Sequence, residues 1–299
     1  MSIVSFTSLL DNALRQGYAV GYFEAWDSYS LEAVLEAAEA ERSPVILGFG
    51  GMMLESTWLD CGGVKLLGAL ARNVGERAQV PVSLLLNEVH TLDQARAGVQ
   101  VGFNAVMLDT SDWPWPLAVE AVTQLVGLAH AHGVAVEAEL GRLPDAVAEG
   151  VDRSRAALTD PQQARQFIEQ TGADCLAVSI GNVHLLTNGY APVDMTHLEA
   201  IHQQLSVPLV IHGGTSFPPS EVPRAIAAGV AKFNVGTLLK RAFLQGMRET
   251  IGAWPGNVNV HDVMGSHKAT DLMTLGQERM KTKVRELMRL YGSTGRAYE

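Results

Sequence analysis

The sequence predicts an eight-stranded α/β barrel, a (β/α)8 TIM barrel with a C-terminal helical extension. Eight short apolar runs alternate with segments whose apolar residues recur at helical spacing, and no low-complexity linker separates them. Alternating β and α units produce a parallel sheet, and eight units favour a closed barrel over an open sheet. The chain has 299 residues, 47% of them hydrophobic, and one barrel needs roughly 250 residues. We therefore expect a single domain over residues 1–299.

The expected strands follow one another through the first 235 residues. Between them, apolar residues at i, i+3 and i+4 spacing indicate helices packed against the sheet. After the eighth unit, residues 257–274 are expected to be irregular, and a final amphipathic helix is expected from about Leu275 to Leu290. The predicted strands are Ala19–Phe23, Pro44–Leu47, Val82–Leu86, Ala105–Leu108, Ala135–Leu140, Cys175–Val178, Leu209–Ile211 and Ala231–Val235.

Residues 208–237 form the clearest single unit of this pattern. A buried strand is expected to end at His212, which is followed at once by a glycine-rich turn. A helix is expected from Pro218 to about Val230, and the next strand ends at another turn. In a barrel of this class, a phosphate commonly binds at the loops after strands seven and eight. The turns that would form such an anion site contain Gly213, Gly214, Thr215, Gly236 and Thr237.

Composition and charge exclude several classes of protein. Twenty-two basic and 32 acidic residues give a net charge of −10, which argues against nucleic acid or an anionic membrane as a partner. The two cysteines are too few for a disulfide framework. No basic leader segment and no run of about 18 apolar residues occurs, so we expect a cytoplasmic protein. The glycine-rich fingerprints of nucleotide-binding folds are absent from the sequence.

Polar side chains collect at the ends of the predicted strands, where barrel enzymes place their functional groups. Histidines and carboxylates that converge from separate strands suit a divalent cation, with Zn favoured by imidazoles and Mn, Co or Mg favoured by oxygens. The sequence leaves open whether Glu139 is a ligand or only bonds a loop, and whether Asp109 orients a ligand or caps a helix. The strand-end residues are Glu24, Asn87, Glu88, Asp109, Glu139, His184, His212 and Asn234.

Several motifs, in one order, resemble a known family. They are Val106-Met107-Leu108-Asp109-Thr110-Ser111, Val136-Glu137-Ala138-Glu139-Leu140-Gly141, Gly181-Asn182-Val183-His184, Ile211-His212-Gly213-Gly214-Thr215 and Lys232-Phe233-Asn234-Val235-Gly236-Thr237. Over nearly the whole chain, the sequence resembles the class II, metal-dependent ketose-bisphosphate aldolases. The resemblance implies a dimeric or tetrameric barrel with a bound Zn on His184 and His212. It also implies peripheral or alternative ligand roles for Glu139 and Asp109, and an enediolate contact for Asn234.

Four positions depart from the family pattern. The family's Leu-Asp-His is Leu86-Asn87-Glu88 here, so an amide replaces the acid/base aspartate and a carboxylate replaces a zinc histidine. An amide cannot transfer a proton at neutral pH. The acidic loop after Gly141 is replaced by residues 142–149, the lysine of the phosphate-binding turn after His184 is missing, and Glu24 replaces an asparagine. These changes predict a cation site with harder, oxygen-bearing ligands. They also favour a substrate with one phosphate group or none over a bisphosphate.

The sequence therefore predicts a divalent-metal-dependent carbon–carbon lyase. Its metal would bind Glu88, His184 and His212, with Zn expected and Mn, Co or Mg as alternatives. The substrate would be a ketose, a keto-sugar or a sugar monophosphate. Two alternatives stay open: an epimerase or isomerase that uses the same site, and a non-catalytic sugar-phosphate-binding protein. The family's acid/base position is occupied by Asn87, and the candidates for the acid/base role are Glu24, His90 three residues past Asn87, Asp145 and Glu149.

Overall fold

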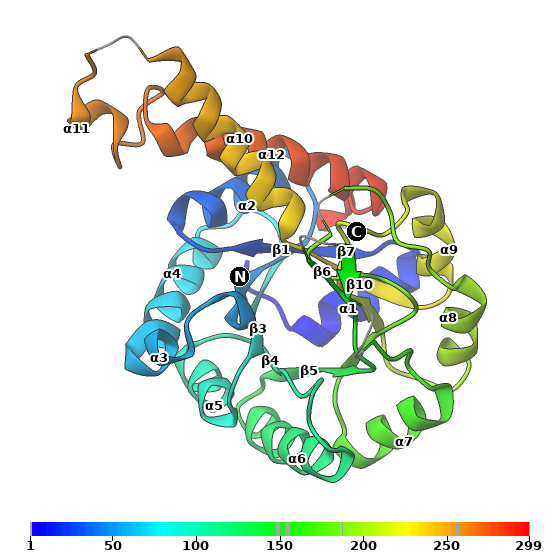
Figure 1. The fold of residues 1–299 in the computed structure, drawn as a ribbon. Helices are drawn as coiled ribbons and strands as arrows, with labels where there is room; N and C mark the ends of the chain where they lie inside the picture. Colours follow the sequence, from blue (N-terminus) through cyan, green and yellow to red (C-terminus); the bar gives the residue numbers. More distant parts are fainter. Residues whose placement is uncertain (1, 148–149, 153–155, 187, 255–256, 299) are drawn as a thin grey trace.

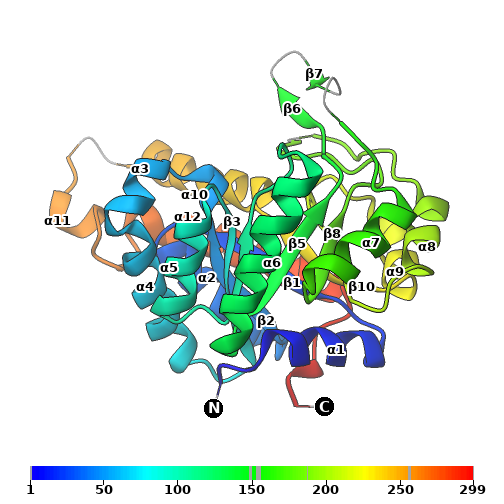
Figure 2. The same ribbon diagram turned by 90° about the horizontal axis from the view of Figure 1, so that it is seen from below.

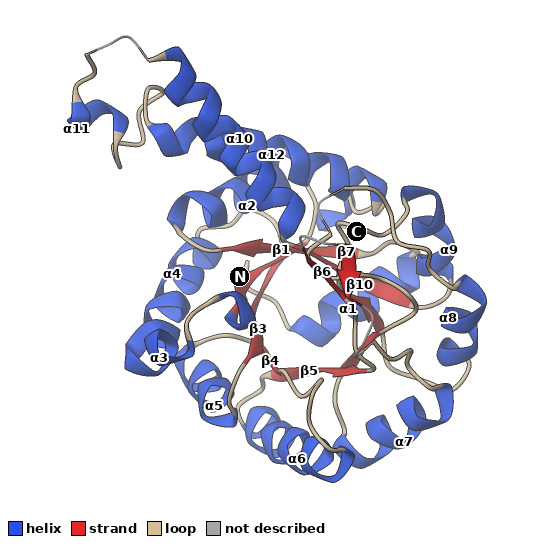
Figure 3. Cartoon of the chain, in the orientation of Figure 1, coloured by secondary structure: helices blue, strands red, loops and turns tan. Residues whose placement is uncertain are grey.

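The computed structural model describes residues 2–147, 150–152, 156–186, 188–254 and 257–298. Eight strands close into a parallel barrel in the order β1-β10-β9-β8-β5-β4-β3-β2, and helices surround it (Figures 1 and 3). The predicted fold is confirmed. The barrel strands are β1 Val20–Ala25, β2 Val45–Gly50, β3 Val82–Val89, β4 Ala105–Leu108, β5 Ala135–Leu140, β8 Cys175–Val178, β9 Leu209–Ile211 and β10 Val230–Val235.

The helices connect the strands and cover the outside of the barrel. Where an apolar stripe repeats every three or four residues, the helix buries that stripe against the sheet. Among the described helices, none combines the length and the apolar character that crossing a membrane requires. The helices are α1 Phe6–Gln16, α2 Ser28–Glu41, α3 Ser56–Trp58, α4 Val64–Glu76, α5 Leu92–Val101, α6 Trp115–Ala131, α7 Pro161–Thr171, α8 Met195–His202, α9 Val222–Ala227, α10 Thr237–Ala253, α11 Val260–Val263 and α12 Leu272–Leu290.

The structure differs from the expectation at three places. A small antiparallel hairpin, β6 Asp145–Val147 with β7 Gly150–Asp152, follows β5 and was not predicted; it stands above one end of the barrel in Figure 2. Helix α9 ends at Ala227, because Gly229 adopts a positive φ of 86° and the chain enters β10 at Val230. The region 257–274 was expected to be irregular but contains α11 and the start of α12.

Helix α12 begins three residues earlier than its apolar pattern indicates. The buried Asp271 is its N-cap and accepts the N–H of Met273, while its other oxygen binds the N–H groups of Ser266 and His267. A side-chain cap satisfies amides that the first helical turn leaves unpaired, so the cap rather than the apolar stripe sets the start.

The interior of the barrel changes from apolar to polar along its axis. Helix α1 covers the N-terminal end, next to both chain termini, and packs Phe6, Leu10 and neighbouring residues on an apolar floor that includes Val20 (Figure 2). Along β1, side chains two residues apart point to the same face, so Tyr22 lies above that floor and Glu24 lies at the C-terminal rim. The polar side chains of the barrel interior therefore lie at its C-terminal end, above a packed apolar core.

The C-terminal helices form an arm beside the barrel. Helices α10 and α12 pack along each other, α12 packs on α2, and the arm extends outward to α11 (Figure 1). The buried carboxylate of Glu41, at the end of α2, binds both Arg285 and Arg289 of α12. This paired contact fixes α12 on the barrel.

Candidate metal centre

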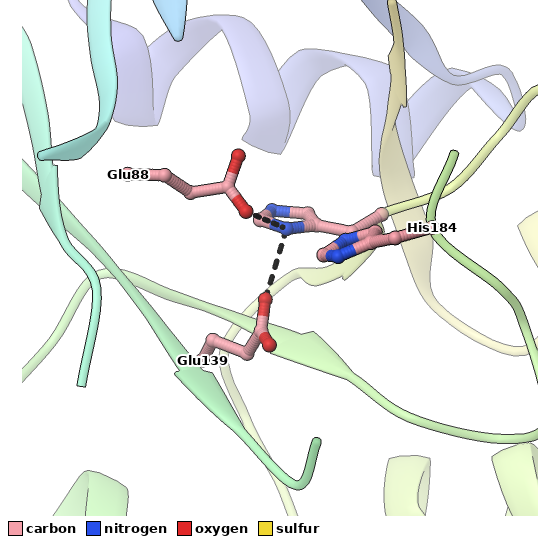
Figure 4. A group of neighbouring side chains, drawn as sticks. Glu88, Glu139 and His184 are labelled. Atoms are coloured by element: carbon pink, nitrogen blue, oxygen red, sulfur yellow. Dashed lines mark ion pairs between the residues drawn. The ribbon is translucent and has the colours of Figure 1, made fainter. Parts of the chain in front are cut away.

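Four side chains converge at the C-terminal rim of the barrel. Glu88, Glu139, His184 and His212 each offer one ligand atom, and these atoms all lie within 4.8 Å of one another. Figure 4 shows the side chains of Glu88, Glu139 and His184 directed toward a common point. The Nδ1 atom of His212 lies 2.9 Å from Oε2 of Glu139 and 3.2 Å from Oε1 of Glu88. Three of these residues were predicted as ligands, and Glu139 was left open.

The backbone at Glu88 is unusual and directs its side chain inward. Glu88 has a φ of 50°, in the left-handed region that few non-glycine residues adopt. The pairing of β3 with β4 shifts register between Leu86 and Val89, so a bulge lies at this position. A β-bulge near a functional site changes the direction in which a side chain points. Here it allows the consecutive residues Asn87 and Glu88 to line the same pocket.

The loops that carry the two histidines are joined to each other. The amide of Asn182 donates to the carbonyl of His212 at 2.8 Å, and Ser216 Oγ donates to the carbonyl of Val183 at 3.0 Å. A Cβ on Gly213 would lie 2.4 Å from the carbonyl oxygen of Val183, and the φ of Gly213 is +66°. Glycine at 213 is therefore required for the close approach that brings His184 beside His212.

The ring of His212 is oriented by a buried carboxylate. Its Nε2 lies 2.8 Å from Oε1 of Glu137, and Lys232 Nζ lies 2.7 Å from Oε2 of the same carboxylate. Neither Glu137 nor Lys232 is exposed. Burial acts to raise the pKa of Glu137, but Lys232 and His212 outweigh it and lower the pKa. An ionised Glu137 accepts a hydrogen bond from Nε2–H of His212, which turns Nδ1 toward Glu88 and Glu139.

The donor set fits a divalent cation. Oε2 of Glu139 and Nδ1 of His212 have no hydrogen-bond partner among the described residues, although both are buried. Buried polar atoms without partners are rare, and lone pairs aimed at one point suit a metal ion. Burial acts to raise the pKa of Glu88, but His212, His184 and Lys232 lower it to about 2. Glu88 is therefore ionised and able to bind a cation.

A pocket of about 230 Å³ opens beside these ligands. Its lining combines metal-centre residues and the charged side chains of Glu24, Lys240 and Arg241 with methionine and leucine side chains. Five of the predicted substrate contacts line it, namely Gly213, Thr215, Asn234, Gly236 and Thr237. Gly214 does not line this pocket, because its N–H donates to the carbonyl of Asn234 and its Cα faces β10.

Glu24 is the predicted acid/base candidate that lines this pocket. Its Oε1 lies 2.5 Å from Lys240 Nζ, and a Cβ on Gly236 would lie 2.2 Å from its Oε2. Burial raises the pKa of Glu24, Lys240 opposes that shift, and Glu88 adds to it. A carboxyl group with a raised pKa inside a pocket is suited to proton transfer near neutral pH.

Other predicted site residues lie elsewhere. Nε2 of His90 lies 3.1 Å from the carbonyl of Leu54, away from the pocket lining. Asp109 is outside the four-ligand group, because its carboxylate accepts the N–H of Ser111 in the turn after β4. Asp145 lies on the hairpin, with Oδ1 3.7 Å from Nδ1 of His184. Glu149 lies outside the described residues.

Five residues at or beneath this site were missed by the sequence analysis. Three of them lie two positions before a predicted site residue on the same strand, so the period-two rule for strands could have found them. The other two lie within the first five residues of α10, directly after the predicted anion loop. The three strand residues are Tyr22, Glu137 and Lys232, and the two helical residues are Lys240 and Arg241.

A closed parallel barrel with histidines and carboxylates gathered at its C-terminal rim is the architecture of a metal-dependent barrel enzyme. The family model for class II fructose-bisphosphate aldolase matches residues 4–296. The chain belongs to that family and is an aldolase-type lyase. Members of the family generally depend on a divalent metal, and the four-ligand group is a candidate site for it.

Relatives of known name cover nearly the whole chain. A probable fructose-bisphosphate aldolase from Bacillus subtilis is 34% identical over 303 residues, which cover 99% of this chain and 100% of the relative. A sulfofructosephosphate aldolase from Alkalicoccus urumqiensis is 32% identical over 299 residues, 99% of each chain. The crystal structure of the YdjI aldolase from Escherichia coli K12 superposes with a TM-score of 0.81 at 26% identity, and 99% of each chain is covered.

Proposed function

We propose that this chain, as one catalytic unit over residues 1–299, cleaves a ketose or sugar monophosphate by a metal-dependent retro-aldol reaction. The observation that carries the proposal is the convergence of Glu88, Glu139, His184 and His212 within 4.8 Å. A divalent cation held there, Zn by preference with Mn, Co or Mg as alternatives, would supply Lewis-acid polarisation of the substrate carbonyl. Two imidazoles and two carboxylates are an acceptable Zn donor set.

Glu24 would carry the proton in this reaction. Its carboxylate takes the proton from the hydroxyl on the carbon β to the carbonyl, and the bond between the α and β carbons then breaks. The aldehyde fragment leaves, and the electron pair remains on the other fragment as an enediolate. Protonation of its carbon gives the ketone product, so no further reactant is needed. Lys240, paired with Glu24, would favour the ionised form.

The substrate class follows from the relatives and from the pocket. The named relatives act, by their names, on fructose bisphosphate or sulfofructose phosphate. In this chain, Thr215, Gly236 and Thr237 line the pocket together with the cationic side chains of Lys240 and Arg241. Lys240 is paired with Glu24, so among the Lys and Arg side chains of the described pocket lining Arg241 is the one available to an anionic group. One anionic group, rather than two, matches this charge.

A cleavage assay tests the proposal. The chain would be incubated with fructose 1-phosphate, fructose 1,6-bisphosphate and unphosphorylated ketoses, before and after chelation, with aldehyde release as the readout. We expect cleavage that chelation abolishes and added Zn restores. An isomeric sugar without fragments would indicate the epimerase or isomerase alternative. Binding without turnover would indicate the non-catalytic alternative, which the amide at Asn87 favours.

We also propose a cytoplasmic homo-oligomer, a dimer or tetramer. The arm presents the exposed apolar side chains of Leu244, Ile251, Val260 and Met264, and exposed apolar surface of this kind suits contact with a second copy. Light scattering on the purified chain tests this, and a monomer at working concentrations would contradict it.

A further inference from the structure

A second cavity lies next to the pocket beside the metal ligands, which we call the metal-centre pocket. The second cavity, the outer groove, has a volume of about 420 Å³, within the range of small-molecule sites. It lies between the loop after β9, the start of α10 and the C-terminal half of α12. Thr215 and Arg241 line both cavities. The metal-centre pocket and the outer groove therefore share a wall.

Most of the outer groove is lined by apolar and aromatic side chains. Phe217 and Tyr291 are buried, and each packs against the ring of Phe233, with centroids 5.3 Å and 4.6 Å apart. These contacts hold the two rings in place. Leu238 and the exposed Tyr190 also line the groove. A preformed apolar lining suits the apolar body of a small molecule, because binding removes that body from water.

Two polar groups of the outer groove have no partner within the described part of the chain. Arg241 forms neither an ion pair nor a hydrogen bond there, and the hydroxyl of Tyr291, a residue only 1% exposed, forms no hydrogen bond there. Lys283 also lines the groove but is already paired with Glu286. A buried hydroxyl without a partner carries a desolvation cost, which a bound molecule removes. The groove therefore offers a cation and a hydroxyl beside its apolar lining.

We propose that the outer groove is a regulatory site for a small monoanion with an aromatic body. The aromatic body packs against Phe217 and Tyr291, the anionic group binds the guanidinium of Arg241, and the hydroxyl of Tyr291 donates a hydrogen bond. Binding there opposes the binding of an anionic substrate, because Arg241 serves both cavities and two anions beside a shared wall repel each other. The binding stands on the groove alone, whereas its effect on turnover rests on the proposed function.

Calorimetric titration with 3-phenylpropionate tests the binding, and its neutral counterpart 3-phenylpropanamide is the matched probe. We expect the anion to bind the wild type about tenfold more tightly, because a hydrogen bond between charged groups contributes more than a neutral one. Arg241→Gln should abolish that preference. Arg248→Gln, on the same helix but lining neither cavity, should keep it. Tyr291→Phe should bind the anion about threefold more weakly, with the melting temperature unchanged.

Three results of the titration would overturn the site. They are no binding to the wild type, a preference for the anion that survives Arg241→Gln, and undiminished binding in Tyr291→Phe. The last of these tests the groove itself, because Tyr291 lines the outer groove and not the metal-centre pocket.

Inhibition kinetics test the coupling between the two cavities. With 3-phenylpropionate bound, KM for fructose 1-phosphate should rise about fivefold, while KM for fructose and both kcat values stay unchanged. Only the phosphorylated sugar brings an anionic group to Arg241. Equal inhibition of both sugars would place the probe in the metal-centre pocket, and that result or an unchanged KM for both sugars overturns the regulatory role. If the wild type cleaves neither sugar, the proposed function has failed, and the titration still decides whether the groove binds the anion.

Discussion

Nε2 of His212 lies 2.8 Å from Oε1 of Glu137, and both side chains are buried below the rim of the barrel. In this contact Nε2–H of His212 donates to the ionised Glu137, which presents Nδ1 to the carboxylates of Glu88 and Glu139. Lys232 keeps Glu137 ionised by binding both of its oxygens. The orientation of a proposed metal ligand therefore depends on an ion pair that the pocket does not expose.

The first prediction concerns this ion pair. Glu137→Gln should weaken Zn binding about 10–100-fold, because the ring of His212 loses the carboxylate that orients it. It should also lower the free energy of unfolding by about 3–5 kcal/mol, since Lys232 stays buried without its counter-ion. Competition with a chromogenic chelator gives the affinity, and urea unfolding gives the stability.

A double variant separates these two effects. Replacing both Glu137 and Lys232 with Met removes both charges of the ion pair. The free energy of unfolding should therefore be higher in this double variant than in Glu137→Gln. The metal affinity should stay low. Recovery of the affinity in the double variant would show that Glu137 has only a structural role.

The second prediction concerns Glu88. Glu88→Ala should reduce bound Zn to well below one equivalent, while Glu88→His should keep it, because imidazole is also a Zn ligand. Histidine is among the residues that tolerate the left-handed backbone found at this position. Metal content by mass spectrometry after dialysis is the measurement. Full metal content in Glu88→Ala would exclude it as a ligand.

The third prediction uses two glycines of the same helical region. Gly236→Ala would place a Cβ 2.2 Å from Oε2 of Glu24, and the φ of Gly236, −128°, lies outside the positive range that favours glycine. We expect kcat to fall at least about tenfold through displacement of Glu24, with metal content unchanged. The control, Gly252→Ala in α10, has open space around its Cβ and should keep full activity. Equal activity in both variants would argue against Glu24 as the proton carrier.

The fourth prediction is a pH dependence of stability at Glu41. Burial acts to raise the pKa of Glu41, but hydrogen bonds from Arg289, Arg285 and Thr294 outweigh it and lower the pKa. A lowered pKa gives stability that is present above the unfolded-state value of about 4.3 and is lost as pH falls through the folded-state value. Glu41→Gln should cost about 1–2 kcal/mol at pH 7 and less near pH 3.

Unfolding by urea at several pH values measures that difference. The quantity of interest is the gap between wild type and Glu41→Gln, because other carboxylates titrate equally in both. A gap that stays constant from pH 7 to pH 3 would contradict the assigned ion pairs. Exposed Glu76, which pairs with Arg72 on the surface, offers a matched Glu→Gln control with a small expected effect.

The strands were predictable because their signal is local. Four of the eight, including β5 and β9, begin and end at the predicted residues, since apolar runs bounded by polar residues define them. The hairpin β6–β7 was missed, because its short strands carry no apolar run. The early start of α12 was missed, because the apolar stripe begins later in the helix, whereas the N-cap Asp271, which accepts the N–H groups of Ser266 and His267, sets the start.

The candidate metal residues were predictable because strand ends of a parallel barrel meet at one rim. The order of β and α segments determined that His184, His212 and Glu88 would lie near one another, whatever the detailed packing. Which atoms face the site was decided only by the folded chain. The positive φ of Glu88, the bond from His212 to Glu137 and the unpaired oxygen of Asn87 all depend on neighbours distant in sequence. A local pattern can specify an element and its face, but the orientation of a side chain is set by the partners that the fold places against it.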